Sequence, residues 1–187
     1  MSEILAPNLH DFWKHNPKIK LRLSVATANI NLARSEADIA IRLARPTQEN
    51  LMIKRLPVIK QGLFASAQYL NGRDPNSLDL NKESFLGMDR SFGDIPEYLW
   101  IIQQNLASQQ KLESSSIRTL CNAAREGCGI ALLPKFIAQL EKLVEIPQPS
   151  LPQRSPYLVF HRDFRNVKRI RLVRDWIAAS FKKALEK

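Results

Sequence analysis

The sequence predicts an α/β protein built from two lobes, and three observations support this class. Apolar segments of strand length alternate with amphipathic helical segments along the chain. A polar, turn-rich segment at residues 71–81 separates two such alternating runs. With 187 residues, 44% hydrophobic and 25% charged, the chain is long enough to bury a core and has the composition of an ordinary globular protein.

The first alternating run opens with a helix and continues with segments of strand character. Apolar side chains between Leu5 and Trp13 fall on one helical face, and Pro7 predicts a kink in its first two turns. Strict alternation over Ile19–Val25 predicts a half-exposed strand, and a short helix is expected over Ile30–Ser35. A buried strand in Ala37–Leu43 and strands in Asn50–Leu56 and Gln61–Ser66 complete the run.

The second run repeats the alternation after the polar segment. A short strand at Phe85–Leu86 is followed by a helix over Glu97–Gln110, which Pro96 precedes. A strand ending in three serines leads into a helix over Ser116–Glu126. A strand at Pro156–His161 precedes the last helix, which begins near Val167 and is expected to bury Ile170, Val173, Ile177, Phe181 and Ala184.

The stretch EGCGIALLP, residues 126–134, contains two glycines that suggest a phosphate-binding loop. Gly127 follows a helix-forming run and is predicted to end that helix in the left-handed conformation, and Gly129 permits a tight turn or a close backbone approach. Ile130–Leu133 then forms a buried strand, and Pro134 fits the first position of the next helix. A dinucleotide loop needs the order strand, glycines, helix, so the order here excludes that motif.

No arrangement of residues predicts an enzyme, and no cofactor or metal is expected. Cys121 and Cys128 lack the spacing of a metal site and are more typical of buried structural cysteines than of a redox pair. None of the three histidines has a Glu-x-x-His partner or a nearby cysteine, and no serine-nucleophile motif is present. An enzyme that uses serines of a cleft remains an alternative.

Hydroxyl side chains are better placed for binding than for chemistry. Ser115 and Ser116 stand between a strand and a helix, and Thr27 and Ser66 also end strands. Helix N-termini with hydroxyl groups bind carboxylates or phosphates, and ligands of α/β sheets lie at the carboxyl ends of strands. For any one of these hydroxyls, simple helix capping is the more economical explanation.

The formal net charge of +10 is concentrated near the C-terminus. Residues His161–Lys187 hold nine Lys or Arg against three Asp or Glu. A solvated helix face is favoured over a nucleic-acid footprint. Aromatic residues are not interleaved among the cations in the way that base-stacking platforms would require. The chain shows no signal peptide and no apolar run of membrane-spanning length, so a cytoplasmic protein without a membrane partner is expected.

Four segments in order resemble the effector-binding domain of LysR-type transcriptional regulators. They are Ile30–Pro46 (INLARSEADIAIRLARP), Met52–Leu70 (MIKRLPVIKQGLFASAQYL), Ala123–Pro134 (AAREGCGIALLP) and Tyr157–Ile177 (YLVFHRDFRNVKRIRLVRDWI). The resemblance implies a type 2 periplasmic-binding-protein-like fold, in which two α/β lobes are joined by two crossover strands. The lobes would comprise residues 1–67 with 162–187 and residues 68–161.

The resemblance also implies a ligand-sensing role and a set of binding residues. A small, anionic effector would bind between the lobes and bias their closure. The family's cleft positions map onto Thr27, Arg42, Ser66, Asp89, Ser115 and Ser116. A homo-oligomer, dimer or tetramer, would form through the helices Ile4–His15 and Ser116–Glu126.

Regulators of this family begin with a DNA-binding helix-turn-helix of roughly ninety residues. That segment is absent from this chain, so DNA would be bound only through a helix-turn-helix outside it. The chain would also begin after the first strand of the domain, leaving the first lobe strained, rearranged or completed by another chain. Two alternatives stay open: a truncated fragment that cannot bind DNA and acts only by dimerisation, and a stand-alone solute-binding module.

Overall fold

The computed structural model describes residues 2–24 and 37–186, and the chain divides into two compact units. The first unit comprises Met1–Val58 and Arg154–Lys187, and the second comprises Ile59–Gln153. The predicted lobes place Ile59–Ala65 in the first lobe, whereas this segment is an inner strand of the second unit's sheet.

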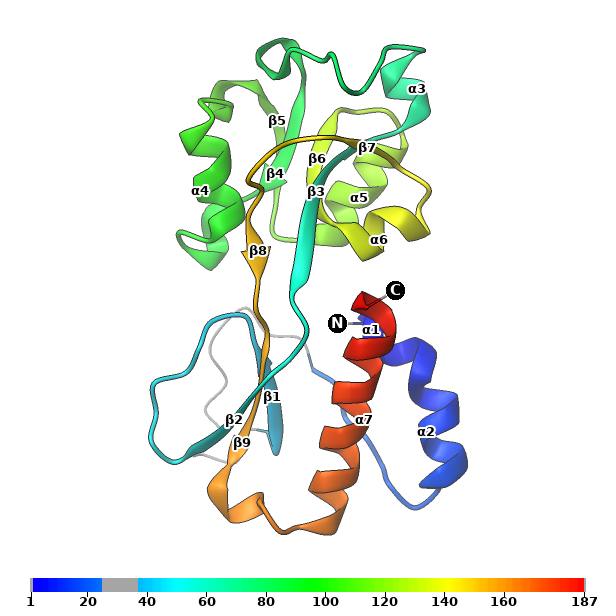
Figure 1. Cartoon of the computed structure of the whole chain (residues 1–187), viewed down its shortest axis with the longest axis vertical. Coiled ribbons are helices and arrows are strands. Elements are labelled where there is room, and N and C mark those ends of the chain that lie inside the picture. Colours follow the sequence, from blue (N-terminus) through cyan, green and yellow to red (C-terminus); the bar gives the residue numbers. More distant parts are fainter. Residues whose placement is uncertain (1, 25–36, 187) are drawn as a thin grey trace. The chain divides into compact units, whose positions relative to one another are not determined.

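The second unit contains most of the strands and four α-helices (Figure 1). Its strands are β3 (Ile59–Ala65), β4 (Phe85–Met88), β5 (Gln110–Ser114), β6 (Ile130–Pro134) and β7 (Val144–Ile146), and β8 (Gln153–Arg154) pairs with β3. Its helices are α3 (Ala67–Leu70), α4 (Pro96–Gln103), α5 (Ile117–Arg125) and α6 (Lys135–Leu140), with 3-10 turns at Leu80–Lys82, Arg90–Phe92 and Ala107–Gln109.

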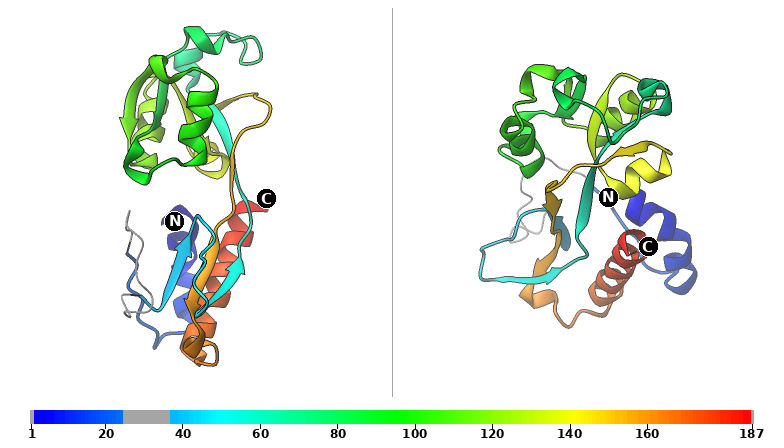
Figure 2. Two further views of the ribbon diagram at one scale, coloured as in Figure 1. Left: turned by 90° about the vertical axis from the view of Figure 1, so that its left-hand side faces the viewer. Right: turned by 45° about the horizontal axis from the view of Figure 1, so that its top comes forward.

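The sheet of the second unit has the order β5-β4-β6-β3-β7 and a hydrophobic core on each face. Trp100 and Ile101 of α4 pack with Leu63 and Ile130 on one face. Leu120 of α5 and Ala138 of α6 belong to the core of the other face, and Figures 1 and 2 show α4 on the opposite side of the sheet from α5 and α6. This three-layer arrangement covers both faces of the sheet, which explains why its inner strands β4 and β6 are continuous apolar runs.

Strand direction defines two different edges of this sheet. β4 is parallel to both β5 and β6, so these three strands end at one edge, named here the carboxyl edge. β3 is antiparallel to β6, with Gln61 opposite Pro134 and Phe64 opposite Ala131. β3 therefore begins at the carboxyl edge and ends at the opposite edge, where it leads into α3 (Figure 1).

The predicted turn within EGCGIALLP is confirmed. Gly127 has φ 78° and ends α5, and the Cys128 N–H donates to the Ala123 carbonyl at 3.0 Å. Gly129 has φ 157°, and a Cβ atom there would lie 2.5 Å from the Ser84 carbonyl oxygen. Pro134 is the N-cap of α6 rather than its first residue. The prediction of buried cysteines is confirmed for Cys121 and wrong for Cys128, which is exposed, and neither forms a disulfide bond.

The helix predicted over Glu97–Gln110 is too long. α4 ends at Gln103, and Asn105 then adopts a left-handed conformation with φ 57°. This turn directs Leu106 into the core, where it is 1% exposed. A left-handed asparagine ends a helix much as glycine does, although the sequence contains no glycine there.

The first unit combines a small antiparallel sheet with helices from both ends of the chain. Its sheet has the order β1-β9-β2, formed by β1 (Ile39–Arg42), β9 (Tyr157–His161) and β2 (Leu51–Arg55). Its helices are α1 (Ser2–Leu5), α2 (Leu9–His15) and α7 (Lys168–Leu185), with 3-10 turns at Ala6–Asn8 and Arg162–Phe164.

The two helices nearest the N-terminus pack against α7, as two views show (Figures 1 and 2). The Trp176 indole N–H donates to the Asn8 carbonyl at 3.1 Å, and the ring centroids of Phe12 and Trp176 lie 4.8 Å apart. The predicted kink at Pro7 is confirmed, because the helix tightens into a 3-10 turn there. Among the predicted buried residues of α7, Ile170, Ile177 and Phe181 are buried, whereas Val173 and Ala184 are half-buried.

The strand predicted over Ile19–Val25 is wrong for residues 19–24, which have no regular structure. Alternation alone does not make a strand, because a second backbone must supply the ladder hydrogen bonds. Leu23 is 54% exposed instead of facing a core. The predicted helix Ile30–Ser35 lies outside the described residues. β1 forms where predicted but is half-buried along its length, as expected for an edge strand.

Candidate functional site

The carboxyl edge of the second unit brings together residues from two loops. Asp89 directly follows β4, and Ser114 ends β5 in register with Met88. The Asp89 N–H donates to the Ser114 carbonyl at 3.3 Å, which ties the two loops together. The structure therefore places Asp89, Ser115 and Ser116 side by side, as strand order at a parallel sheet requires.

The Asp89 carboxylate is held by hydrogen-bond donors at this edge. The Ser91 side chain donates to it, and the Ser91 N–H donates at 2.9 Å. The Ser91 hydroxyl, the Ser91 N–H and the Ser115 N–H together lower the pKa of Asp89. These donors favour the charged form of the Asp89 carboxylate. The Asp-x-Ser spacing is a local turn signal, so the hydrogen bonds from Ser91 to Asp89 could have been predicted from the sequence.

The N-terminus of α5 lies at the same edge. The Ser116 hydroxyl accepts from the Thr119 N–H at 3.2 Å and caps the helix, and the Ser114 hydroxyl accepts from the Ser116 N–H at 3.1 Å. The Ser115 side chain is exposed, and its hydroxyl makes no hydrogen bond to the residues that the structure describes. Ser115 is thus the serine of this group whose hydroxyl remains available to a ligand.

A buried polar pair supports the edge from the α4 face of the sheet. The Gln61 amide of β3 donates to the Glu97 carboxylate of α4 at 3.1 Å, and the two residues are 6% and 7% exposed. Glu97 lies in the first turn of α4, where the helix dipole favours negative charge. This pair was not among the predicted site residues, although a glutamine directly before the apolar run Gly62–Ala65 was a visible signal.

The remaining predicted residues are not brought to this edge. Ser66 lies at the opposite edge of the sheet, where its hydroxyl accepts from the Tyr69 N–H at 3.2 Å and caps α3. Arg42 is the last residue of β1 in the first unit. Thr27 lies outside the described residues.

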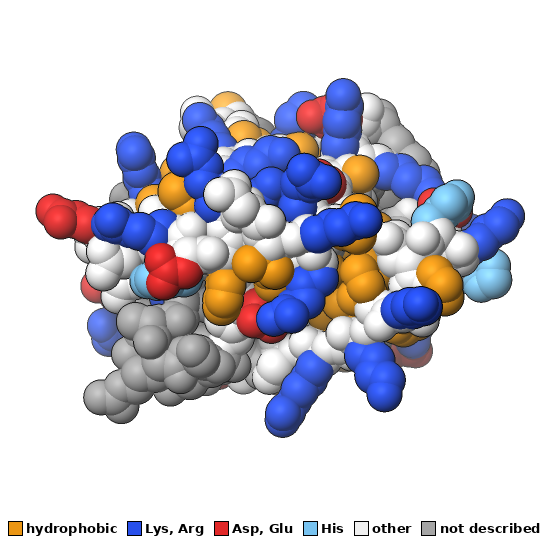
Figure 3. All heavy atoms as spheres, turned by 90° about the horizontal axis from the view of Figure 1, so that it is seen from below, with side chains coloured by type: hydrophobic (Ala, Val, Ile, Leu, Met, Phe, Trp, Pro, Cys, Tyr) orange, Lys and Arg blue, Asp and Glu red, His pale blue; other side chains and the backbone are white. Residues whose placement is uncertain are grey.

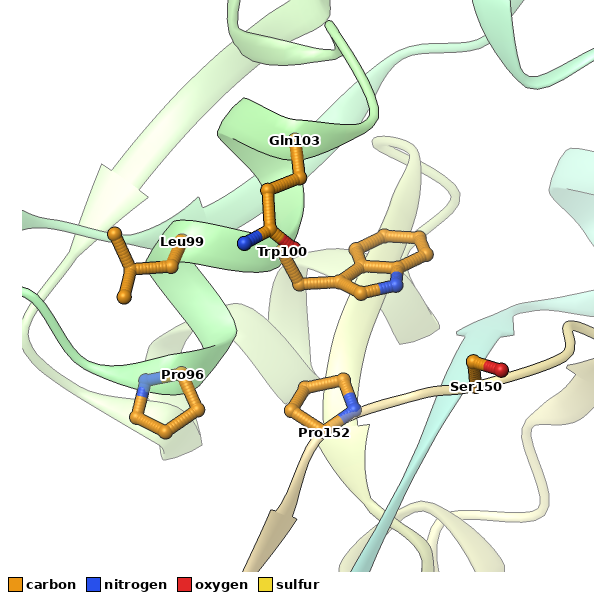
Figure 4. A pocket seen from close by; sticks show the side chains of 6 residues that line it. All are labelled: Pro96, Leu99, Trp100, Gln103, Ser150 and Pro152. Carbon is orange, nitrogen blue, oxygen red and sulfur yellow. The ribbon is translucent and has the colours of Figure 1, made fainter.

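A separate groove of about 270 Å³ lies on the α4 side of the second unit (Figure 4). It is lined by Pro96, Leu99, Trp100, Gln103, Ser150 and Pro152. Figure 4 shows the α4 side chains facing the segment that carries Ser150 and Pro152. The groove is lined mostly by apolar side chains, and no charged side chain is among them.

Two other kinds of site are absent from the described part of the chain. No group of three or more His, Cys, Asp or Glu side chains there could hold a metal ion. Among residues 2–24 and 37–186, no helix is both long enough and apolar enough to cross a bilayer.

Two α/β units with this strand order define a class of protein, the type 2 periplasmic-binding-protein-like fold. The chain belongs to the LysR substrate binding domain family, whose family model matches residues 1–182. The regulatory domain of CrgA from Neisseria meningitidis is similar with a TM-score of 0.77 and 23% identity, over 97% of this chain and 94% of that one. The effector domain of AmpR from Pseudomonas aeruginosa has a TM-score of 0.72 and 21% identity, over 96% and 90%. These two likenesses show the fold alone.

The curated relatives are named as transcription regulators. The Mau operon transcriptional activator of Paracoccus denitrificans is 28% identical over 183 residues, covering 97% of this chain and 62% of the relative. An HTH-type transcriptional repressor of Pseudomonas aeruginosa is 27% identical over 198 residues, covering 95% and 60%. The chain therefore spans about three fifths of the length of these relatives.

Proposed function

We propose that this chain is the effector-sensing part of a transcription regulator and that it binds a small carboxylate at the carboxyl edge of its second unit. The observation that carries the proposal is the exposed Ser115 hydroxyl beside the N-terminus of α5. Membership of the LysR substrate binding domain family supports the sensing role.

The chemistry of the edge favours an anion. The N-terminus of a helix of nine residues carries N–H groups and a partial positive charge directed at a bound anion. The donors around Asp89 are occupied by its own carboxylate. A ligand carboxylate would instead accept from the exposed Ser115 hydroxyl, which makes no hydrogen bond to the residues that the structure describes.

The proposal is tested by thermal melting and calorimetry with a panel of small carboxylates and the corresponding neutral amides. Carboxylates should raise the melting temperature of the wild-type chain, and the amides should not. Ser115→Ala should weaken the binding of an active carboxylate about tenfold, because a hydrogen bond to a charged acceptor is lost. Ser108→Ala should bind like the wild type, because Ser108 is an exposed serine in the 3-10 turn before β5, at the opposite end of that strand from Ser115.

Ser115 is preferred to Ser116 for this test because Ser116 is the helix cap. Ser116→Ala should lower stability by about 1 kcal/mol, which would confuse folding with binding. Stabilisation by carboxylates and amides alike would contradict an anion site. Unchanged affinity of Ser115→Ala would place the site elsewhere.

We further propose that the regulator acts as a homo-oligomer in the cytoplasm, through the α1–α2 segment and α5. Light scattering of the purified chain tests this directly. A dimer that melts independently of any ligand would favour the alternative of a fragment acting only by dimerisation. A monomer that binds the ligand well would favour a stand-alone solute-binding module.

A further inference from the structure

The net positive charge of the chain comes from one of its two units. Residues 1–58 and 154–187 hold 19 Lys or Arg against 8 Asp or Glu, whereas residues 59–153 hold 9 against 10. The first unit therefore has a net charge of +11 and the second of −1. Such segregation is a property of the fold, because the two halves of the first unit lie at opposite ends of the sequence.

Within the first unit, the charge is densest where β9 leads into α7. Five exposed cations lie within ten residues, and they are named here the basic surface: Arg162, Arg165, Lys168, Arg169 and Arg171. Figure 3, which views the end of the molecule where α7 begins, shows Lys and Arg side chains spread over that face. The one acidic residue between 162 and 171, Asp163, faces His161, with 3.2 Å between the His161 Nδ1 and the carboxylate.

Within residues 2–24 and 37–186, no carboxylate neutralises the cations of this surface. Among the described residues, Arg165, Lys168, Arg169 and Arg171 have no carboxylate within 4.0 Å. Arg162 reaches only the Glu49 carbonyl and the Asn50 side-chain oxygen, at 3.3 and 2.8 Å. Solvated surface cations elsewhere in the chain do find carboxylates, as Lys182 does with Glu186.

The position of these cations is unfavourable for the isolated domain. Lys168, Arg169 and Arg171 occupy the first turns of an 18-residue helix, whose N-terminus already carries partial positive charge. That turn contains no acidic residue, and the N-cap Val167 offers no side-chain acceptor. A local arrangement that opposes the helix dipole without compensation inside the protein indicates an anionic partner outside it.

We propose that the basic surface of the first unit contacts the phosphate backbone of duplex DNA. The curated relatives of the chain are transcription regulators, so duplex DNA is the polyanion beside which such a domain works. Phe164 is the one aromatic residue among these cations and it is half-buried, so the surface offers no row of rings for stacking on single-stranded bases. Phosphate contacts do not depend on such rings. The contact is independent of sequence, and it adds to any operator recognition made by a helix-turn-helix outside this chain.

The test is a titration of the purified chain into a labelled duplex of about 30 base pairs of arbitrary sequence. At about 50 mM NaCl, we expect a Kd of about 10–100 µM. The logarithm of the affinity should fall against the logarithm of the salt concentration with a slope of about −3 to −4, since about four phosphates are neutralised. This experiment uses no small ligand, so its outcome is separate from that of the effector proposal.

Two matched variants separate the contribution of the basic surface to DNA binding from the contribution of the total charge. The first replaces Arg165, Lys168, Arg169 and Arg171 with Gln. The control replaces four exposed lysines of the second unit with Gln, namely Lys60, Lys82, Lys111 and Lys142. Both lower the net charge by four. The first variant should bind DNA at least about tenfold more weakly, and the control should change affinity by less than about twofold. Circular dichroism checks that both variants fold. Arg165→Glu with Arg169→Glu also lowers the net charge by four but changes only two residues.

Equal losses in the two variants would overturn the proposal, because the attraction would then depend on total charge alone. Absence of DNA binding at about 100 µM protein and about 50 mM salt would also overturn it. Binding to vesicles of phosphatidylserine in place of DNA would overturn the assignment of the partner and make the surface a lipid contact.

Discussion

Asp89 links the candidate site to the stability of the chain at different pH values. Its pKa is lowered in the folded state, first by the Ser91 hydroxyl and then by backbone N–H groups. A depressed folded pKa gives stability that is present above the unfolded value, near pH 4, and that is lost as pH falls through the folded value. The carboxylate thus stabilises its own loop at neutral pH.

We therefore expect Asp89→Asn to lower the melting temperature at pH 7, with a smaller difference from the wild type near pH 3. Thermal melts followed by circular dichroism at several pH values measure this. Glu113→Gln, which changes an exposed carboxylate of β5 that makes no ion pair with the described residues, is the control and should show little pH-dependent difference. A constant difference across pH would show that the charge of Asp89 does not matter.

Gly129 provides a second test at the scale of one residue. A Cβ there would meet the Ser84 carbonyl oxygen at 2.5 Å, and the φ of 157° is unfavourable for other residues. Gly129→Ala should lower the free energy of unfolding by about 3 kcal/mol, from strain and steric overlap together.

Gly72→Ala is the matched control, because Gly72 has φ 77° but nothing within 4 Å of its added Cβ. Only the conformational cost of about 1 kcal/mol should appear there. Urea denaturation of both variants gives the comparison. Equal losses would mean that the contact with Ser84 relaxes freely.

At the scale of elements, α7 begins without a cap although it is the longest helix described. Val167 has an extended backbone, with φ −76° and ψ 114°, which suits a capping side chain. Val167→Asp should raise the free energy of unfolding by about 0.5–1 kcal/mol, because aspartate accepts from the first turn and complements the helix dipole.

Chemical denaturation of Val167→Asp beside Val167→Ala measures the effect of the cap. The alanine variant removes the same half-buried side chain without adding an acceptor, so it should be no more stable than the wild type. If the aspartate variant were the less stable of the two, the N–H groups in the first turn of α7 would already have hydrogen-bond acceptors.

Elements defined by local signals were predicted well from the sequence. The C-cap at Gly127 and the strand after it follow from glycine and proline chemistry within nine residues. Ile19–Val25 failed as a strand because its existence depends on a distant partner that alternation does not reveal. The end of α4 failed because a left-handed asparagine has no strong sequence signal.

The candidate site shows the same division between local and distant information. Asp89 and Ser115 follow strands in the sequence and meet because those strands are parallel neighbours. Ser66 also follows a strand, but β3 runs in the opposite direction to β6, which places Ser66 at the other edge. Strand direction is set by topology, and no residue near Ser66 encodes it.

At the scale of the whole molecule, the unequal charge of the two units predicts a response to salt. Repulsion among the cations of the first unit is screened when the Debye length falls below their spacing. Raising NaCl from about 20 to about 300 mM should therefore raise the melting temperature of the wild-type chain.

The rise should be smaller for the variant that replaces Arg165, Lys168, Arg169 and Arg171, and unchanged for the control in the second unit. Differential scanning calorimetry at the two salt concentrations gives these values. A melting temperature that falls with salt would mean that favourable ion pairs outweigh repulsion in the folded chain.

The two cysteines differ in exposure, so one of them can be labelled selectively. Cys121 is buried within α5, while Cys128 is exposed between Gly127 and Gly129. A maleimide dye should therefore couple to one thiol in the native chain and to two after denaturation. Because Cys128 immediately precedes β6, the dye would sit at the far edge of the sheet from Asp89 and Ser115. The natural sequence thus carries a single attachment point for a fluorescent reporter that leaves the proposed effector site unobstructed.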